Sequence, residues 1–97
     1  MPHITSIWWT PEEPISLSSG YIIDPTFRMQ VIFSDGRILS VIRGPYTYGG
    51  DIGLYECGYV LNKETGLAAH PVWGDSVNGH LDEDEVVSEL RWIRDDE

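Results

Sequence analysis

The sequence predicts a small α+β domain, in which an antiparallel sheet of four or five strands in meander-like order carries one C-terminal α-helix on one face. Two segments support this prediction: a pair of β-rich runs between residues 27 and 43 that flank a turn, and a capped amphipathic helix at about 83–94. The length of 97 residues fits one hydrophobic core, so residues 1–97 are expected to form a single domain.

The expected strands are short runs of β-branched and aromatic residues bounded by proline, glycine or asparagine. A brief additional strand is expected at residues 21–23, after a loop rich in proline and serine. Pro71 interrupts the last of the main runs, and this makes that run a candidate edge strand. The main strands are expected at about 4–9, 27–34, 37–43, 54–61 and 67–73.

The residues between 27 and 43 predict a β-hairpin, because Asp35-Gly36 separates two β-rich runs. A two-residue turn would place Arg28 opposite Arg43, and directly opposed like charges are unfavourable. A three-residue loop with Gly36 in the left-handed conformation avoids that pairing, so we favour the bulged register. In this register three isoleucines, at 32, 38 and 42, share the second face of the sheet, which the N-terminal loop or another subunit is expected to cover in part.

The helix begins with a capping-box pattern, in which Asp82 caps the first turn and Glu85 occupies the third helical position. Carboxylates at 82–85 lie at the positive end of the helix dipole, and Arg91 and Arg94 lie near its negative end. Helix stability alone therefore explains much of this charge pattern.

A helical projection places valines, Leu90 and Ile93 on one stripe, about 120° wide, that is expected to face the core. Trp92 falls nearly opposite this stripe, close to Glu85 and Glu89. An indole among carboxylates suits an interface anchor, with the alternative that a tail or the 10–20 loop covers it. The expected partner-binding residues on the helix and after it are Glu85, Glu89, Trp92, Asp95 and Asp96.

The formal net charge of −10 opposes direct binding to nucleic acids and to anionic membranes, which requires lysine and arginine. The same charge attracts basic protein surfaces, including the grooves of nucleic-acid-handling proteins. Residues 81–97 hold eight of the sixteen carboxylates and two arginines. Carboxylates three and four residues apart on a helix are about 5–6 Å apart, so this segment suits a DNA mimic, although acidity also serves solubility alone.

The connection between residues 44 and 53 is rich in glycine and tyrosine and is longer than a usual hairpin loop. Exposed Tyr46 and Tyr48 beside glycine-freed amides suit a nucleotide-binding loop, helped by Arg28 or Arg43. The alternative is a structural turn whose tyrosines pack on the sheet.

The sequence nominates no catalytic residue, metal site or cofactor, because its histidines, cysteine and serines match no motif spacing for these chemistries. The single cysteine, Cys57, is expected to be a small, partly buried strand residue. The chain has no run of eighteen apolar residues and no signal-like N-terminus, so we expect a cytoplasmic protein and no membrane association.

These features favour a small acidic inhibitor that blocks a basic nucleic-acid-binding surface of a host protein. The size and acidity are typical of small phage-encoded inhibitors, including anti-CRISPR and other anti-defence proteins, although no shared motif supports a family. The alternatives are an immunity protein against a nuclease toxin and a nucleotide-signal sponge that uses Tyr46 and Tyr48. Both a monomer and a homodimer are compatible with the sequence.

Overall fold

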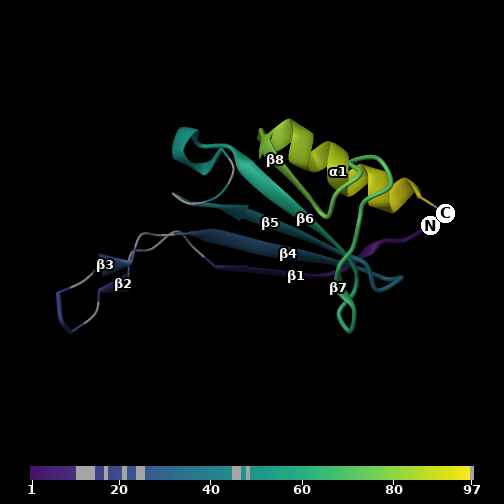
Figure 1. The fold of residues 1–97 in the computed structure, drawn as a ribbon. Helices are drawn as coiled ribbons and strands as arrows, with labels where there is room; N and C mark the ends of the chain where they lie inside the picture. The colour runs from purple at the N-terminus through teal and green to yellow at the C-terminus, as the bar shows by residue number, and fades with distance from the viewer. Residues whose placement is uncertain are drawn as a thin grey trace.

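The computed structural model describes residues 1–10, 15–16, 18–20, 22–23, 26–44, 47 and 49–96. The described residues form eight strands, one short 3-10 helix and one α-helix (Figure 1). In chain order these elements are β1 (Ile4–Thr10), β2 (Ile15–Ser16), β3 (Ile22–Ile23), β4 (Phe27–Phe33), β5 (Ile38–Arg43), η1 (Gly50–Ile52), β6 (Tyr55–Asn62), β7 (Gly66–Leu67), β8 (Val77–Leu81) and α1 (Glu83–Asp95).

The main sheet is antiparallel and has the order β1-β4-β5-β6, after which β7 and β8 both pair with β6. β8 lies along the first half of β6, and β7 pairs near its end. The two-residue strands β2 and β3 pair with each other in a small arm that projects beyond the main sheet (Figure 1). The helix α1 lies across one face, so the predicted α+β class and meander-like sheet with a C-terminal helix are confirmed, with a somewhat larger number of strands.

The hairpin between β4 and β5 adopts the bulged register that the opposed arginines favour. Phe33 and Arg37 bracket a three-residue loop through a hydrogen bond from the Phe33 N–H to the Arg37 carbonyl (2.9 Å), and Gly36 has a φ of 93°. Arg28 consequently pairs with Ile42, while Arg43 pairs with Phe27. This register places Val31, Phe33, Leu39 and Val41 on the face that α1 covers.

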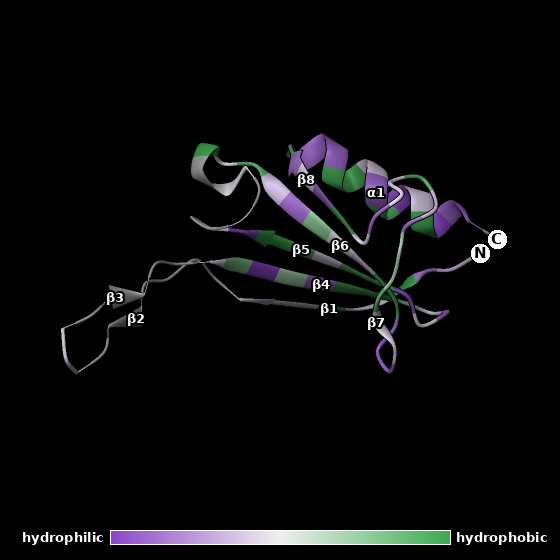
Figure 2. Cartoon of the chain, viewed as in Figure 1, coloured by the Kyte–Doolittle hydropathy of each residue, from purple (hydrophilic) through white to green (hydrophobic). Residues whose placement is uncertain are grey.

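The core lies between this face of the sheet and the helix. Its buried members alternate along the strands, as the period of two requires, and α1 contributes Val86 and Ile93. Figure 2 shows the hydrophilic side of the helix turned away from the sheet. The buried hydrophobic residues are Val31, Phe33, Leu39, Val41, Cys57, Tyr59, Leu81, Val86 and Ile93.

The opposite face of the sheet carries Ile32, Ile38 and Ile42, each of intermediate exposure. Among the described residues, the α-helix packs only against the other face, and these three isoleucines do not belong to the buried cluster. The N-terminal loop that was expected to cover them lies partly outside the described residues.

The expected strand at about 67–73 is wrong beyond Leu67. After β7 the chain turns tightly: the His70 N–H donates to the Asp75 carbonyl (2.8 Å), and the Gly74 N–H donates to the His70 carbonyl (2.9 Å). These local bonds replace ladder pairing in a segment where Pro71 has no N–H to donate. Residues 77–81, where no strand was expected, form β8, in which Asn78 pairs with Cys57.

The helix start agrees with the predicted capping box. The Asp82 carboxylate accepts a hydrogen bond from the Glu85 N–H (2.8 Å), and the Glu85 carboxylate accepts one from the Asp82 N–H (3.2 Å). Leu81 and Val86, which lie on either side of the cap, both belong to the core.

Candidate protein-binding surfaces

The carboxylates predicted to bind a partner already have partners within the chain. Glu85 serves the capping box, and the Glu89 carboxylate accepts a hydrogen bond from the Trp73 indole N–H (3.0 Å). Asp95 pairs with Arg94 (2.9 Å), and Asp96 pairs with Arg37 (2.7 Å). Each of these four carboxylates therefore has a partner within the chain: Glu85 in the helix cap, Glu89 at Trp73, and Asp95 and Asp96 at arginines.

Trp92 does not point into solvent among carboxylates, as the helical projection predicted. Its ring lies 4.2 Å from the His70 ring and 6.4 Å from the Tyr59 ring, measured between centroids, and it packs against the core. The segment after β7, which was not expected to lie there, partly covers Trp92. The helical projection missed this because it contains no information about distant segments.

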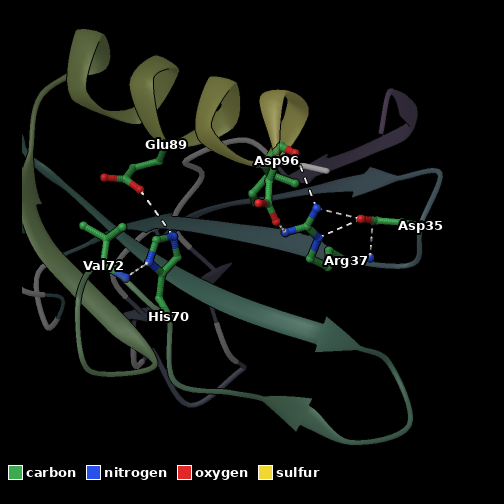
Figure 3. Close-up of polar contacts among 7 residues, drawn as sticks. Asp35, Arg37, His70, Val72, Glu89 and Asp96 are labelled. Atoms are coloured by element: carbon green, nitrogen blue, oxygen red, sulfur yellow. Dashed lines mark hydrogen bonds and ion pairs between the residues drawn. The ribbon is translucent and has the colours of Figure 1, made fainter. Parts of the chain in front are cut away.

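His70 lies at the centre of this aromatic cluster and is only 1% exposed. Its ring is stacked on Trp73, with centroids 4.1 Å apart and planes inclined by 10°. The Nδ1 atom accepts hydrogen bonds from the N–H groups of Val72 (3.0 Å) and Trp73 (3.4 Å), so the neutral ring carries its proton on Nε2 (Figure 3). That buried Nε2 has no hydrogen-bond partner among the described residues, and it faces a Glu89 oxygen 3.9 Å away.

The two titratable groups of this cluster have shifted pKa values. Burial, followed by the positive charge of Arg37, lowers the pKa of His70. Burial also raises the pKa of Glu89, with a smaller contribution from Glu85, against the opposing effect of the Trp73 hydrogen bond. Both pKa shifts arise largely because the 68–76 segment covers this side of the helix and excludes water from it.

Arg37 fastens the end of the helix to the hairpin loop between β4 and β5. Its guanidinium, largely buried, contacts the carboxylates of Asp35 and Asp96 at 2.7 Å each, and also donates to the Ile93 carbonyl (3.5 Å) (Figure 3). Burial alone would raise the pKa of Asp35, but the hydrogen bonds and charge of Arg37 hold this pKa below its usual value. Asp96 is therefore a structural ion-pair partner of Arg37.

Glu83 and Asp84, in the first turn of α1, have acidic side chains open to solvent. Both are exposed, and neither side chain has a hydrogen bond or ion pair with another described residue. Glu83 also lies at the rim of a groove of about 250 Å³ between the helix and the sheet, lined by Phe27, Met29, Val41, Tyr55, Val86, Val87 and Leu90. The negative charge of this turn is therefore available to a partner.

A second surface, which the sequence analysis did not single out, is the edge strand β1. All seven of its residues are exposed, including Ile7 (53%), Trp8 (67%) and Trp9 (65%). Trp9 shares the helix-bearing face with Met29, and Trp8 shares the opposite face with Gln30, because paired residues point the same way. The available signal was the composition: residues 4–10 hold two tryptophans and no charge in a chain that is 23% charged.

The Tyr46 and Tyr48 positions of the predicted nucleotide-binding loop lie outside the described residues. The described part of that loop is tightly folded, since the Thr47 hydroxyl bridges the N–H and the carbonyl of Gly44 (2.9 Å each). Arg43, a predicted helper, donates to the Tyr55 hydroxyl (3.1 Å) and lies 4.7 Å above the Tyr55 ring.

Other chemistry-bearing groups are few in the part of the chain that the structure describes. Cys57 is fully buried in β6, where burial and the nearby Glu89 and Glu56 charges raise the thiol pKa to about 12. No group of three or more His, Cys, Asp or Glu residues is arranged to hold a metal ion among the described residues. Within the same residues, no helix is long and apolar enough to cross a bilayer.

Comparison with known proteins finds no matching family model, no matching curated protein and no matching solved structure.

Proposed function

We propose that this chain is a small acidic binding protein that inhibits a nucleic-acid-handling protein by occupying a basic surface on it. The observation that supports the proposal is the first turn of α1, where the Glu83 and Asp84 side chains are exposed and unpaired among the described residues. The surrounding molecule carries a formal net charge of −10, so its field steers it toward positive surfaces.

This surface differs from the one expected from the sequence. The Glu85 and Asp82 carboxylates each accept a hydrogen bond from the other residue's backbone N–H, and Glu89 and Trp92 are partly covered by the 68–76 segment. Recognition by charge therefore depends on Glu83 and Asp84, with the apolar groove beside Glu83 available to a hydrophobic side chain of the partner. The groove supplies buried apolar contact, and the carboxylates supply orientation and association rate.

The proposal is tested by affinity capture from a host lysate with the wild type, with Glu83→Lys and with the matched control Glu64→Lys. Both substitutions change the net charge equally, and both residues are exposed glutamates, but Glu64 lies in the turn after β6. We expect the wild type and Glu64→Lys to capture a basic nucleic-acid-binding protein, and Glu83→Lys to capture at least about tenfold less.

The association rate of the captured partner should then fall steeply as salt is added, since screening weakens steering between exposed charges. Equal capture by all three forms would contradict the role of the first turn. An association rate that does not respond to salt would contradict recognition by charge altogether.

A further inference from the structure

β1 is an edge strand with the composition of an interface. It pairs with β4 on one side, and no other described strand pairs with it on the other side. Natural edge strands are usually protected by charge, proline, shortness or a covering segment, because an open row of N–H and C=O groups recruits further strands. β1 is seven residues long and has no charge or proline, and no described segment covers its outer edge; its one irregularity is a register shift between Ile4 and Ser6.

We propose that β1 forms an antiparallel pair with β1 of a second copy of this chain, giving a two-fold dimer with one continuous sheet. A strand that pairs with itself in this way meets an identical edge, so the outward N–H and C=O groups of each copy face those of the other. The proposal concerns the opposite edge of the sheet from the acidic first turn, and it does not depend on the proposed function.

The exposed indoles of β1 supply a large part of the area that a second copy requires. Trp8 and Trp9 are 67% and 65% exposed, which leaves about 200–300 Å² of indole surface uncovered. Specific interfaces begin at roughly 600 Å² per partner, and Ile4, Ile7 and the edge backbone add to the contribution of the indoles. A monomer would leave this strip in water.

The charge distribution permits this pairing despite the net charge of −10 on each copy. β1 carries no charge, and the acidic first turn of α1 follows β8, which pairs with β6. Two strands separate β6 from β1, so the β6 strands of the two copies would be seven strand spacings, about 34 Å, apart. That separation is several Debye lengths at physiological salt, about 8 Å each, so repulsion between the two acidic turns is largely screened.

The register follows from which side chains share a face. In a two-fold antiparallel pair, each residue lies opposite a residue whose side chain points to the same face of the sheet. The two-fold axis therefore passes between the two copies of one residue, and not between two neighbouring residue pairs. An axis at Trp8 places Trp8 beside Trp8 of the other copy on one face, and Ile7 opposite Trp9 on the helix-bearing face. This arrangement brings the largest exposed side chains together, and aromatic cross-strand pairs are among the stabilising ones.

The test is sedimentation equilibrium of the full chain at micromolar concentration, with Ile7→Lys, Trp9→Lys and the control Val72→Lys. Val72 is 70% exposed on the segment after β7, so the control introduces the same charge at another exposed apolar side chain. We expect a dimer of twice 11.0 kDa for the wild type and for Val72→Lys. We expect the dissociation constant of the dimer to rise at least about tenfold in the β1 variants.

A second measurement tests the pairing without removing the tryptophans. In the Trp8-centred register Ser6 lies opposite Thr10 of the other copy, so an oxidised mixture of Ser6→Cys and Thr10→Cys should yield a covalent dimer. Each variant alone should yield none through these positions, and the buried native Cys57 remains in both.

Either of two findings would overturn the proposal: a wild type that sediments as an 11.0 kDa species, or a dimer that Ile7→Lys and Trp9→Lys leave intact. Open-ended aggregates would also overturn it, since they indicate an edge that does not close on itself. A dimer sensitive to both lysines, without cross-linking in the mixture, would overturn the Trp8-centred pairing. Circular dichroism and a cooperative melt of each variant distinguish loss of pairing from loss of fold.

Discussion

His70 connects the segment after β7 to the helix through one buried ring. It contacts the rings of Tyr59, Trp73 and Trp92, and it accepts two backbone hydrogen bonds that fix its tautomer. Protonation of Nδ1 would break those bonds, and the positive Arg37 further opposes a charged ring. The folded protein therefore holds this histidine neutral.

The pH dependence of stability follows from this shift. Because the pKa of His70 is lower in the folded state, the unfolded chain takes up a proton first as the pH falls below about 6.5. The contribution of His70 to the free energy of unfolding should therefore decrease as the pH is lowered from about 7.5 to about 5.5. In His70→Asn this decrease should be smaller, although the variant should be less stable by about 1–3 kcal/mol at neutral pH through lost ring contacts.

Chemical denaturation across this pH range measures both effects, and the exposed His3→Asn serves as the control. The raised pKa of Glu89 acts in the opposite direction, because its folded form retains a proton to higher pH than the unfolded chain does. An unchanged pH slope in His70→Asn would contradict the neutral buried imidazole.

At the scale of the element, α1 depends on its reciprocal cap. Asp82→Ala removes the acceptor for the Glu85 N–H and should lower the free energy of unfolding by about 1 kcal/mol. Asp84→Ala removes a carboxylate from the same turn but no cap bond, so it should cost less, about 0.3–1 kcal/mol through the helix dipole. Thermal or urea unfolding of the two variants measures the difference, and equal losses would argue against the cap.

The elements predicted well from the sequence are those set by local chemistry. The capped helix and the bulged hairpin each follow from a few neighbouring residues, such as Asp82 with Glu85, and Gly36 between two β-rich runs. The 67–73 and 77–81 segments were predicted poorly, because their structure depends on the turn around His70 and on pairing with β6. Trp92 was misplaced for the same reason, since the segment that covers it is distant from the helix in sequence.

The candidate surfaces, too, were predicted only in part from the sequence. The sequence identified the acidic helix as a region of interest, but it could not show that Glu85, Glu89, Asp95 and Asp96 are engaged within the fold. Nor did it show that β1 lies at an edge, because strand order is a property of the whole sheet. Exposure of Trp8 and Trp9 follows only from that order.

At the scale of the whole molecule, the two proposals together describe a bivalent protein with its acidic turns at the two outer ends. Such a dimer should bind a surface that displays many copies of the captured partner about 10²–10⁴ times more tightly than a monomer does. Ile7→Lys should lose this gain while keeping the affinity of a single site, and Val72→Lys should keep it.

Surface plasmon resonance at low and at high partner density measures this difference. Slower dissociation of the wild type, seen only at high density, is the expected result. The same dissociation rate for the wild type and Ile7→Lys at high density would contradict bivalent binding.

The position of the helix in the chain bears on how the protein is made. Phe33, Leu39, Val41 and Tyr59 lie on strands that precede α1 in the chain, so Val86 and Ile93, which cover them, leave the ribosome after them. During translation the nascent chain therefore carries a sheet with one bare apolar face and an open edge. Chaperone demand and aggregation of interrupted chains should be greatest after the strands have emerged and before α1 follows them.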